Sequence, residues 1–146
     1  NVRLAAADAT DDEALDRFIA TVGPCDHAVV SIAGGAHIGP FAGFGDTEFD
    51  RTIDGKLRPY VHASRAALSV LRPGGSLTLV TGMSARRAWD RLPEPARRAL
   101  FDGAAARTPL GRVATPADVA RAVHALARAS FVTGVVVPCD GGAHLP

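Results

Sequence analysis

Two short apolar runs form the framework of the chain. Residues 28–33 and 76–81 are rich in Val, Ile, Leu, Ala and Thr and carry no charged residue. Runs of this length and composition predict strands that are buried on both faces of a parallel sheet. Shorter runs at 2–7 and 135–137 predict two further strands. The glycines at 34 and 35 end the first run, and glycine lets a ligand approach the backbone closely.

Between the strands, apolar residues recur with the spacing of one helical face. The first set lies at i, i+3, i+4 and i+7 and consists of Leu15, Phe18, Ile19 and Val22. A capping box at 10–13, with Thr10 as the cap, precedes this set and predicts where the helix begins. Gly23 followed by Pro24 predicts its end.

The later helices are predicted by caps and by proline positions. Residues 47–71 predict a helix with a break or bend near 55–59, because Pro59 removes a helix hydrogen bond. A turn at 72–75 separates it from the next strand. Residues 96–106 predict a short helix, and Thr115 predicts the cap of a final helix with Asp118 at its third position. The glycine-rich loop 34–45 follows a strand's carboxyl end and is a candidate wall of a site.

Strands that alternate with helices in this way predict an α/β fold, a doubly wound parallel sheet of the Rossmann-like kind. A length of 146 residues suits one domain, 1–146. The net charge of +1 gives no reason to expect a nucleic-acid or membrane partner, and no apolar run is long enough to span a bilayer. Cys25 and Cys139 form no CxxC pair, so both are predicted to be reduced, buried and cytoplasmic. The five histidines show no metal-ligand spacing, so no metal is predicted.

Several segments resemble the short-chain dehydrogenase/reductase family. The likeness is carried by Pro109-Leu110-Gly111-Arg112, 115–120, 131–134, Asp140-Gly141-Gly142, 7–11, Ser31-Ile32-Ala33-Gly34 and 75–82. It implies an oxidoreductase that transfers a hydride between NAD or NADP and a small-molecule alcohol or carbonyl compound, and that works as a homodimer or homotetramer. The choice between NAD and NADP depends on a second strand that these segments do not include, so it stays open.

The resemblance also implies site residues. Asp8 would accept a hydrogen bond from the adenine amino group, or else merely end a strand. Ser31, Ala33 and Gly34 would line the cofactor. Ser84 would polarise the substrate carbonyl, although Gly82 stands at the family's serine position and Ser84 comes two residues later.

Lys56 stands where the family usually has an asparagine of the proton relay. It would either replace that asparagine or be a solvated lysine at a helix start. The resemblance does not decide between these roles.

Two family motifs, TGxxxGxG and Tyr-x-x-x-Lys, do not occur in the sequence. In the family's strand order 3-2-1-4-5-6-7, the segments 2–7, 28–33, 76–81 and 135–137 would be strands 3, 4, 5 and 7. Only 28–33 and 76–81 would then be neighbours, and the other two strands would lack hydrogen-bonding partners. We therefore expect an incomplete portion of the fold, joined across an internal gap between Ser84 and Trp89. A truncated fragment, or a compact domain with re-paired strands, is the alternative. Two other functions stay open: a catalytically dead cofactor-binding relative, and an oligomer-building scaffold that uses the small-residue face of 61–71.

Overall fold

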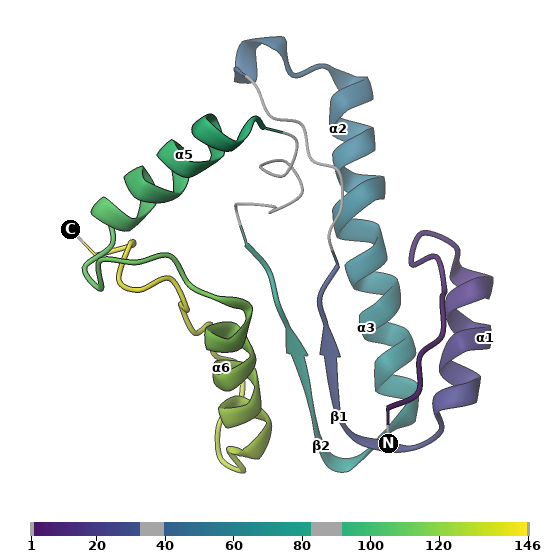
Figure 1. Cartoon of the computed structure of the whole chain (residues 1–146). Coiled ribbons are helices and arrows are strands. Elements are labelled where there is room, and N and C mark those ends of the chain that lie inside the picture. Colours follow the sequence, from purple (N-terminus) through teal and green to yellow (C-terminus); the bar gives the residue numbers. More distant parts are fainter. Residues whose placement is uncertain (1, 33–39, 83–91, 146) are drawn as a thin grey trace. The chain divides into compact units, whose positions relative to one another are not determined.

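The structure is a computed structural model that describes residues 2–32, 40–82 and 92–145. The chain divides into two compact units, residues 1–81 and residues 82–146. Unit 1 contains, in order, α1 (Asp12–Val22), β1 (Cys25–Val30), the 3-10 turn η1 (Phe41–Gly43), α2 (Asp46–Thr52), the π-helical turn η2 (Ile53–Leu57), α3 (Arg58–Val70) and β2 (Leu71–Leu79). Unit 2 contains α5 (Glu94–Ala106) and α6 (Pro116–Arg128) (Figure 1). The predicted join between Ser84 and Trp89 lies outside the described residues.

The two apolar runs pair as a parallel, two-stranded sheet, β1 with β2, as predicted. The register runs from His27 opposite Ser76 to Val30 opposite Leu79. Cys25 lies opposite Leu71, so residues 72–75 form an irregular excursion inside β2. The prediction of a separate turn at 72–75 was therefore wrong in its boundaries. Gly74, with φ of +81°, takes the left-handed conformation that this excursion needs.

The other two predicted strands do not form in the described residues. Residues 2–7 and 135–137 have no strand partner, and a lone strand leaves its backbone groups without ladder hydrogen bonds. The expectation that only two strands would be neighbours is thus met. The prediction that both faces of these strands are buried is wrong, because Val29 is 50% exposed and Leu79 is 47% exposed.

The first helix begins one residue later than its capping box predicts. Asp11, rather than Thr10, is the N-cap, and its carboxylate accepts a hydrogen bond from the Ala14 backbone N–H at 3.0 Å. Thr10 instead donates to the side chain of Asp8. The helix ends at Gly23, with φ of +72°, as the sequence predicts.

The predicted interruption near 55–59 is a π-helical turn. Residues Ile53–Leu57 widen the helix by one turn of i→i+5 spacing between α2 and α3. Pro59 lies in the first turn of α3 and is fully buried. Proline cannot donate a backbone hydrogen bond, so the helical hydrogen-bond pattern is interrupted here. The π-helical turn accommodates the interruption, and the backbone stays helical from α2 to α3.

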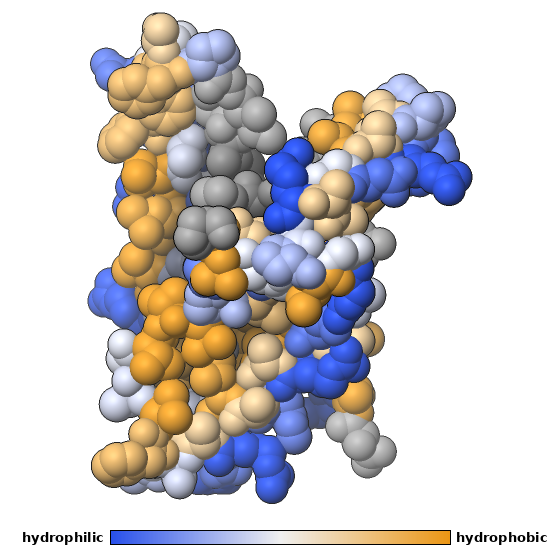
Figure 2. Space-filling view, turned by 90° about the vertical axis from the view of Figure 1, so that its left-hand side faces the viewer, coloured by the Kyte–Doolittle hydropathy of each residue, from blue (hydrophilic) through white to orange (hydrophobic). Residues whose placement is uncertain are grey.

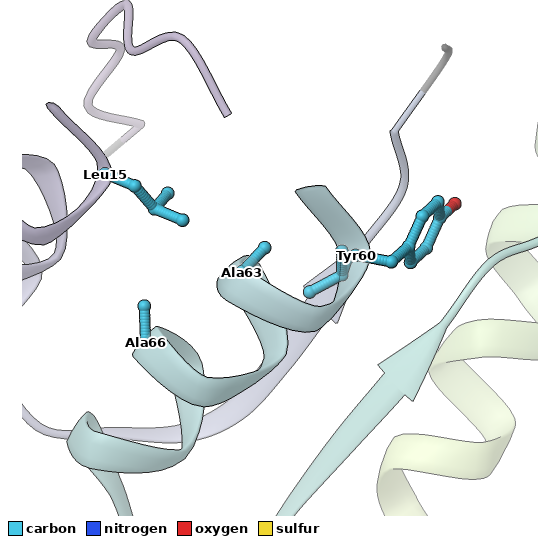
Figure 3. Packing of buried hydrophobic residues seen from close by; sticks show 5 residues of the cluster. Leu15, Tyr60, Ala63 and Ala66 are labelled. Atoms are coloured by element: carbon cyan, nitrogen blue, oxygen red, sulfur yellow. The ribbon is translucent and has the colours of Figure 1, made fainter. Parts of the chain in front are cut away.

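The apolar core of unit 1 lies between α1, α3 and β1 (Figure 3). Leu15 of α1 points at Ala63 and Ala66 of α3, and Val30 of β1 completes the cluster. Ala67 is buried as well. These three alanines belong to the small-residue face of 61–71, and because they pack inside the unit they are not free for a subunit contact.

Unit 2 is organised by polar contacts. The capping box of α6 forms as predicted, with Thr115 and Asp118 bonded reciprocally. Arg112 binds both carboxylate oxygens of Asp118, at 2.7 and 3.0 Å. The turn at 140–143 forms as well, and the Leu110 N–H donates to the Gly141 carbonyl at 3.3 Å.

Many apolar residues remain on the surface, as the orange areas of Figure 2 show. Cys139 is exposed and Cys25 is half-buried, which corrects the prediction that both are buried. Cys139 lies two residues after the segment 135–137, which has no strand neighbour within the described part of the chain. Among the described residues, no helix has the length and apolar character needed to span a membrane.

Candidate active site

The carboxyl ends of β1 and β2 are the natural place for a site, since ligands of open α/β sheets bind beyond these ends. The ladder continues for one bond past the strands, where the Val80 N–H donates to the Val30 carbonyl at 2.8 Å. Beyond that bond, the side chain of Tyr60 of α3 lies between the segments that continue β1 and β2. Its hydroxyl accepts a hydrogen bond from the Ile32 N–H at 3.1 Å and donates one to the Val80 carbonyl.

Tyr60 reaches this position because its ring is buried at the start of α3 (Figure 3). The side chain points away from Leu15, toward the sheet, with the hydroxyl at its tip. Only 7% of the residue is exposed. The hydroxyl is therefore a fixed polar group at the end of an apolar core, with one donor partner and one acceptor partner.

Lys56 of the π-helical turn lies beside Tyr60. Its Nζ donates to the Ile32 carbonyl at 2.6 Å and lies 5.0 Å from the centre of the Tyr60 ring. The alternative of a solvated lysine is therefore wrong, because Lys56 is half-buried and bonded to backbone. Whether it takes part in a proton relay stays a prediction.

Only two of the five predicted site residues belong to the described part of the chain. Ser31 directly follows β1 and is exposed. Ala33, Gly34 and Ser84 lie outside the described residues. Their roles remain predictions.

Asp8 is exposed and takes part in a local turn. Its Oδ1 accepts hydrogen bonds from the Thr10 backbone N–H at 2.9 Å and from the Thr10 hydroxyl at 2.7 Å. These bonds favour the charged form, so they hold the pKa of the Asp8 carboxyl below its usual value. The contacts account for Asp8 as a turn residue before α1, and its role toward adenine stays a prediction.

Gly82, at the family's serine position, follows β2 and is exposed. Among the described residues, apart from its neighbours in the chain, no atom lies within 4 Å of the place where a Cβ would stand. A side chain at this position would therefore displace none of these described residues.

The sequence did not single out Tyr60 for the site, and it left Lys56 undecided. Their spacing of four residues was a usable signal, since residues four apart share one helix face. What could not be read from the sequence was the insertion of the hydroxyl between two strand ends. Within the described segments, no three His, Cys, Asp or Glu side chains come together as a metal site.

Comparisons with known proteins agree with the motifs. Residues 92–144 match a family model described as enoyl-(acyl carrier protein) reductase. Over 38 residues, 26% of this chain, the sequence is 58% identical to a ketoacyl reductase assigned to the granaticin polyketide synthase of Streptomyces violaceoruber. That stretch spans only 15% of the reductase.

Solved structures show the same fold. One small-chain dehydrogenase, solved in complex with NADPH, matches 97% of this chain and 84% of its own, with a TM-score of 0.85 and 22% identity. A short-chain dehydrogenase/reductase from Brucella melitensis, named as a glucose/ribitol dehydrogenase, matches 96% of this chain and 74% of its own, with a TM-score of 0.74 and 24% identity. The doubly wound, Rossmann-like α/β class predicted from the sequence is thereby confirmed. In its partial sequence matches and in its fold, the chain is similar to short-chain dehydrogenases/reductases.

Proposed function

We propose that this protein is an oxidoreductase that transfers a hydride between a nicotinamide cofactor, NAD or NADP, and an alcohol or carbonyl substrate. The observation that carries the proposal is the parallel pair β1–β2, whose carboxyl ends are followed by the family's site segments. Sites of doubly wound sheets lie at this edge. Residues 1–146 would then belong to one nicotinamide-binding domain.

Each predicted residue has a stated role in this proposal. Ala33 and Gly34 would offer backbone to the cofactor, with Ser31 beside them, and Asp8 would bind the adenine. Ser84 would donate a hydrogen bond to the substrate carbonyl and so favour attack on its carbon. The bound nicotinamide supplies the hydride chemistry itself, while the protein binds and orients the cofactor and substrate.

The test is a titration of the full chain with NADPH and, separately, with NADH, followed by the change in nicotinamide fluorescence. NADPH comes first, because the small-chain dehydrogenase with a matching fold was solved with it. Saturable binding, together with consumption of the reduced cofactor in the presence of carbonyl compounds, is the expected result. Binding of neither cofactor would refute the proposal. The stronger of the two titrations also settles the preference between NAD and NADP.

A second candidate function is a relative that binds the cofactor without turning it over. Gly82 favours it, since glycine at the serine position has no side chain to polarise a carbonyl. Binding without turnover would support this function. Gly82→Ser sharpens the distinction, because no described residue beyond the chain neighbours of Gly82 lies where its Cβ would stand. A gain of turnover in that variant would identify a missing hydroxyl as the cause.

We also propose that the protein forms a homodimer or homotetramer in the cytoplasm. Three large apolar residues of η2 and α3 are close to half exposed or more: Leu57, Val61 and Leu68. Exposed apolar side chains along one helix suit a contact with another copy. Sedimentation equilibrium of the full chain measures the oligomeric state, and a monomer at micromolar concentration would contradict the proposal. The two free cysteines support the cytoplasmic location.

A further inference from the structure

We propose that Tyr60, supported by Lys56, is a positioning residue that holds β1 and β2 apart at their carboxyl ends and so sets how the nicotinamide cofactor binds. The cofactor part of this inference rests on the proposed function. The effect on the strands does not, and it is tested separately below.

The regular hydrogen bonds of a parallel pair show what Tyr60 replaces. Val30 lies opposite Leu79, and its carbonyl accepts from the Val80 N–H at 2.8 Å. In a parallel ladder, a residue that donates its N–H to one residue of the partner strand accepts, at its own carbonyl, from the N–H two positions further along that strand. Val80 donates to Val30, so its carbonyl would accept from residue 32. This next bond would run from the Ile32 N–H to the Val80 carbonyl.

The Tyr60 hydroxyl occupies the place of that bond. It accepts from the Ile32 N–H at 3.1 Å and donates to the Val80 carbonyl. Two hydrogen bonds through one oxygen span more distance than one direct bond. Both backbone groups stay satisfied while the strands separate, so the opening leaves no unpaired polar group behind.

Lys56 binds the carbonyl of Ile32, the residue whose N–H is bound by Tyr60. Its Nζ donates to the Ile32 carbonyl at 2.6 Å, so both polar backbone atoms of Ile32 are bonded to side chains from one helical segment. The ammonium also lies 5.0 Å from the centre of the Tyr60 ring, a favourable cation–π distance. The π-helical turn supplies Lys56, and the first turn of α3 supplies Tyr60.

The anchored residue is next to the predicted cofactor-binding backbone. Ile32 lies between Ser31 and Ala33, two of the residues predicted to line the cofactor. A backbone fixed before the ligand arrives has less conformational freedom to lose on binding. Tyr60 and Lys56 would therefore act on cofactor affinity without touching the cofactor.

Tyr60→Phe is the decisive variant, because it removes the hydroxyl and keeps the buried ring. The Ile32 N–H and the Val80 carbonyl can then pair directly and close the strand ends. We expect the Kd for NADPH to rise about tenfold, the change that corresponds to roughly 1.4 kcal/mol, with little loss of stability to urea. A residue that served stability alone would show the reverse pattern, with lower stability and unchanged affinity.

Lys56→Met provides a second route to the same result. We expect a rise in Kd of about threefold, since one of the two anchors of Ile32 remains. Lys56→Arg keeps a donor and a cation and should recover part of the loss. Arg58→Gln is the matched control, because Arg58 lies at the start of α3 in an exposed pair with Asp54. It should leave the Kd unchanged.

The outcomes separate the two proposals. If the wild type binds NADPH, and both Tyr60→Phe and Lys56→Met bind it equally well, the inference is overturned and the proposed function stands. If the wild type binds neither NADPH nor NADH, the proposed function fails, and with it the cofactor part of the inference. The amide proton chemical shift of Ile32 then decides the strand part, because in Tyr60→Phe the acceptor of this N–H changes from the Tyr60 hydroxyl to the Val80 carbonyl. A chemical shift that does not change in Tyr60→Phe would show that the hydroxyl does not hold this position.

Discussion

The two units of the chain are stabilised by different interactions. Every hydrophobic residue that is buried in the described structure lies in unit 1, in the cluster of Leu15, Val30, Tyr60 and the alanines of α3. In unit 2, neither α5 nor α6 has a buried residue. Its order rests instead on a capping box, a bidentate arginine and a glycine-rich turn.

The difference shows what local signals achieve without a core. A capping box sets where α6 begins, and α5 begins directly after Pro93 with no side-chain cap. Such signals act within a few residues. They do not cover apolar surface, so Phe131 is fully exposed and Val136 is 94% exposed. Helices of this length gain most of their stability from packing. Unit 2 should therefore unfold locally at a lower free energy than unit 1.

The largest expected effect tests the core of unit 1. Leu15→Ala should lower its free energy of unfolding by about 2–3 kcal/mol, since Leu15 fills the space against Ala63 and Ala66. Urea denaturation of the full chain measures this value. The control is Leu68→Ala on the exposed side of α3, with an expected change within about 0.5 kcal/mol. Equal losses in the two variants would mean that the cluster is not the stabilising core.

A smaller loss of stability is expected when a polar contact of unit 2 is removed. Thr115→Ala removes the N-cap of α6 and should cost about 1 kcal/mol of helix stability. The loss should show as faster amide hydrogen exchange in α6, with exchange in α3 unchanged. Thr115→Ser keeps the hydroxyl and should behave like the wild type. A loss in α3 as large as that in α6 would contradict the separation into two differently stabilised units.

The smallest expected effect is a loss of stability of unit 2 at low pH. Hydrogen bonds from Arg112, and then from Thr115, hold the pKa of the Asp118 carboxyl far below its usual value. The unfolded chain therefore takes up the proton first as pH falls, which favours unfolding. The contribution is fully present above about pH 4, where an unfolded aspartate is ionised, and is lost progressively below it.

Helicity of unit 2 should accordingly decline below about pH 4, as followed by amide exchange in α6. Asp118→Asn should flatten this decline, because the titrating carboxyl is gone. Asp102→Asn on α5 removes the same charge at an exposed site and is the control. A decline that is equally steep in all three proteins would assign the acid effect to other groups.

Much of the secondary structure was readable from the sequence, because its signals are local. The cap at Thr115, the stop at Gly23 and the interruption before Pro59 each depend on nearby residues, and each prediction is confirmed. The errors arose where the outcome depends on a partner. The strand at 135–137 required a neighbour, and the cap of α1 moved to Asp11 because Thr10 binds Asp8.

The candidate site was less accessible for the same reason. Family motifs pointed to the ends of 28–33 and 76–81, and the structure brings those two ends together. The contact of Tyr60 with both Ile32 and Val80 joins residues 28 and 20 positions away. No periodicity or spacing in the sequence encodes such a contact, because it arises only when α3 packs on the sheet.

The π-helical turn sets the rotational phase between α2 and α3. Each residue of a helix advances the side chains by about 100°, so the wider turn at Ile53–Leu57 offsets the faces of α2 from those of α3. Since Leu15 and Val30 hold α3 in place, shortening this turn by one residue would rotate α2. A one-residue change in this turn would therefore shift α2, while α3 would keep the Tyr60 hydroxyl between Ile32 and Val80.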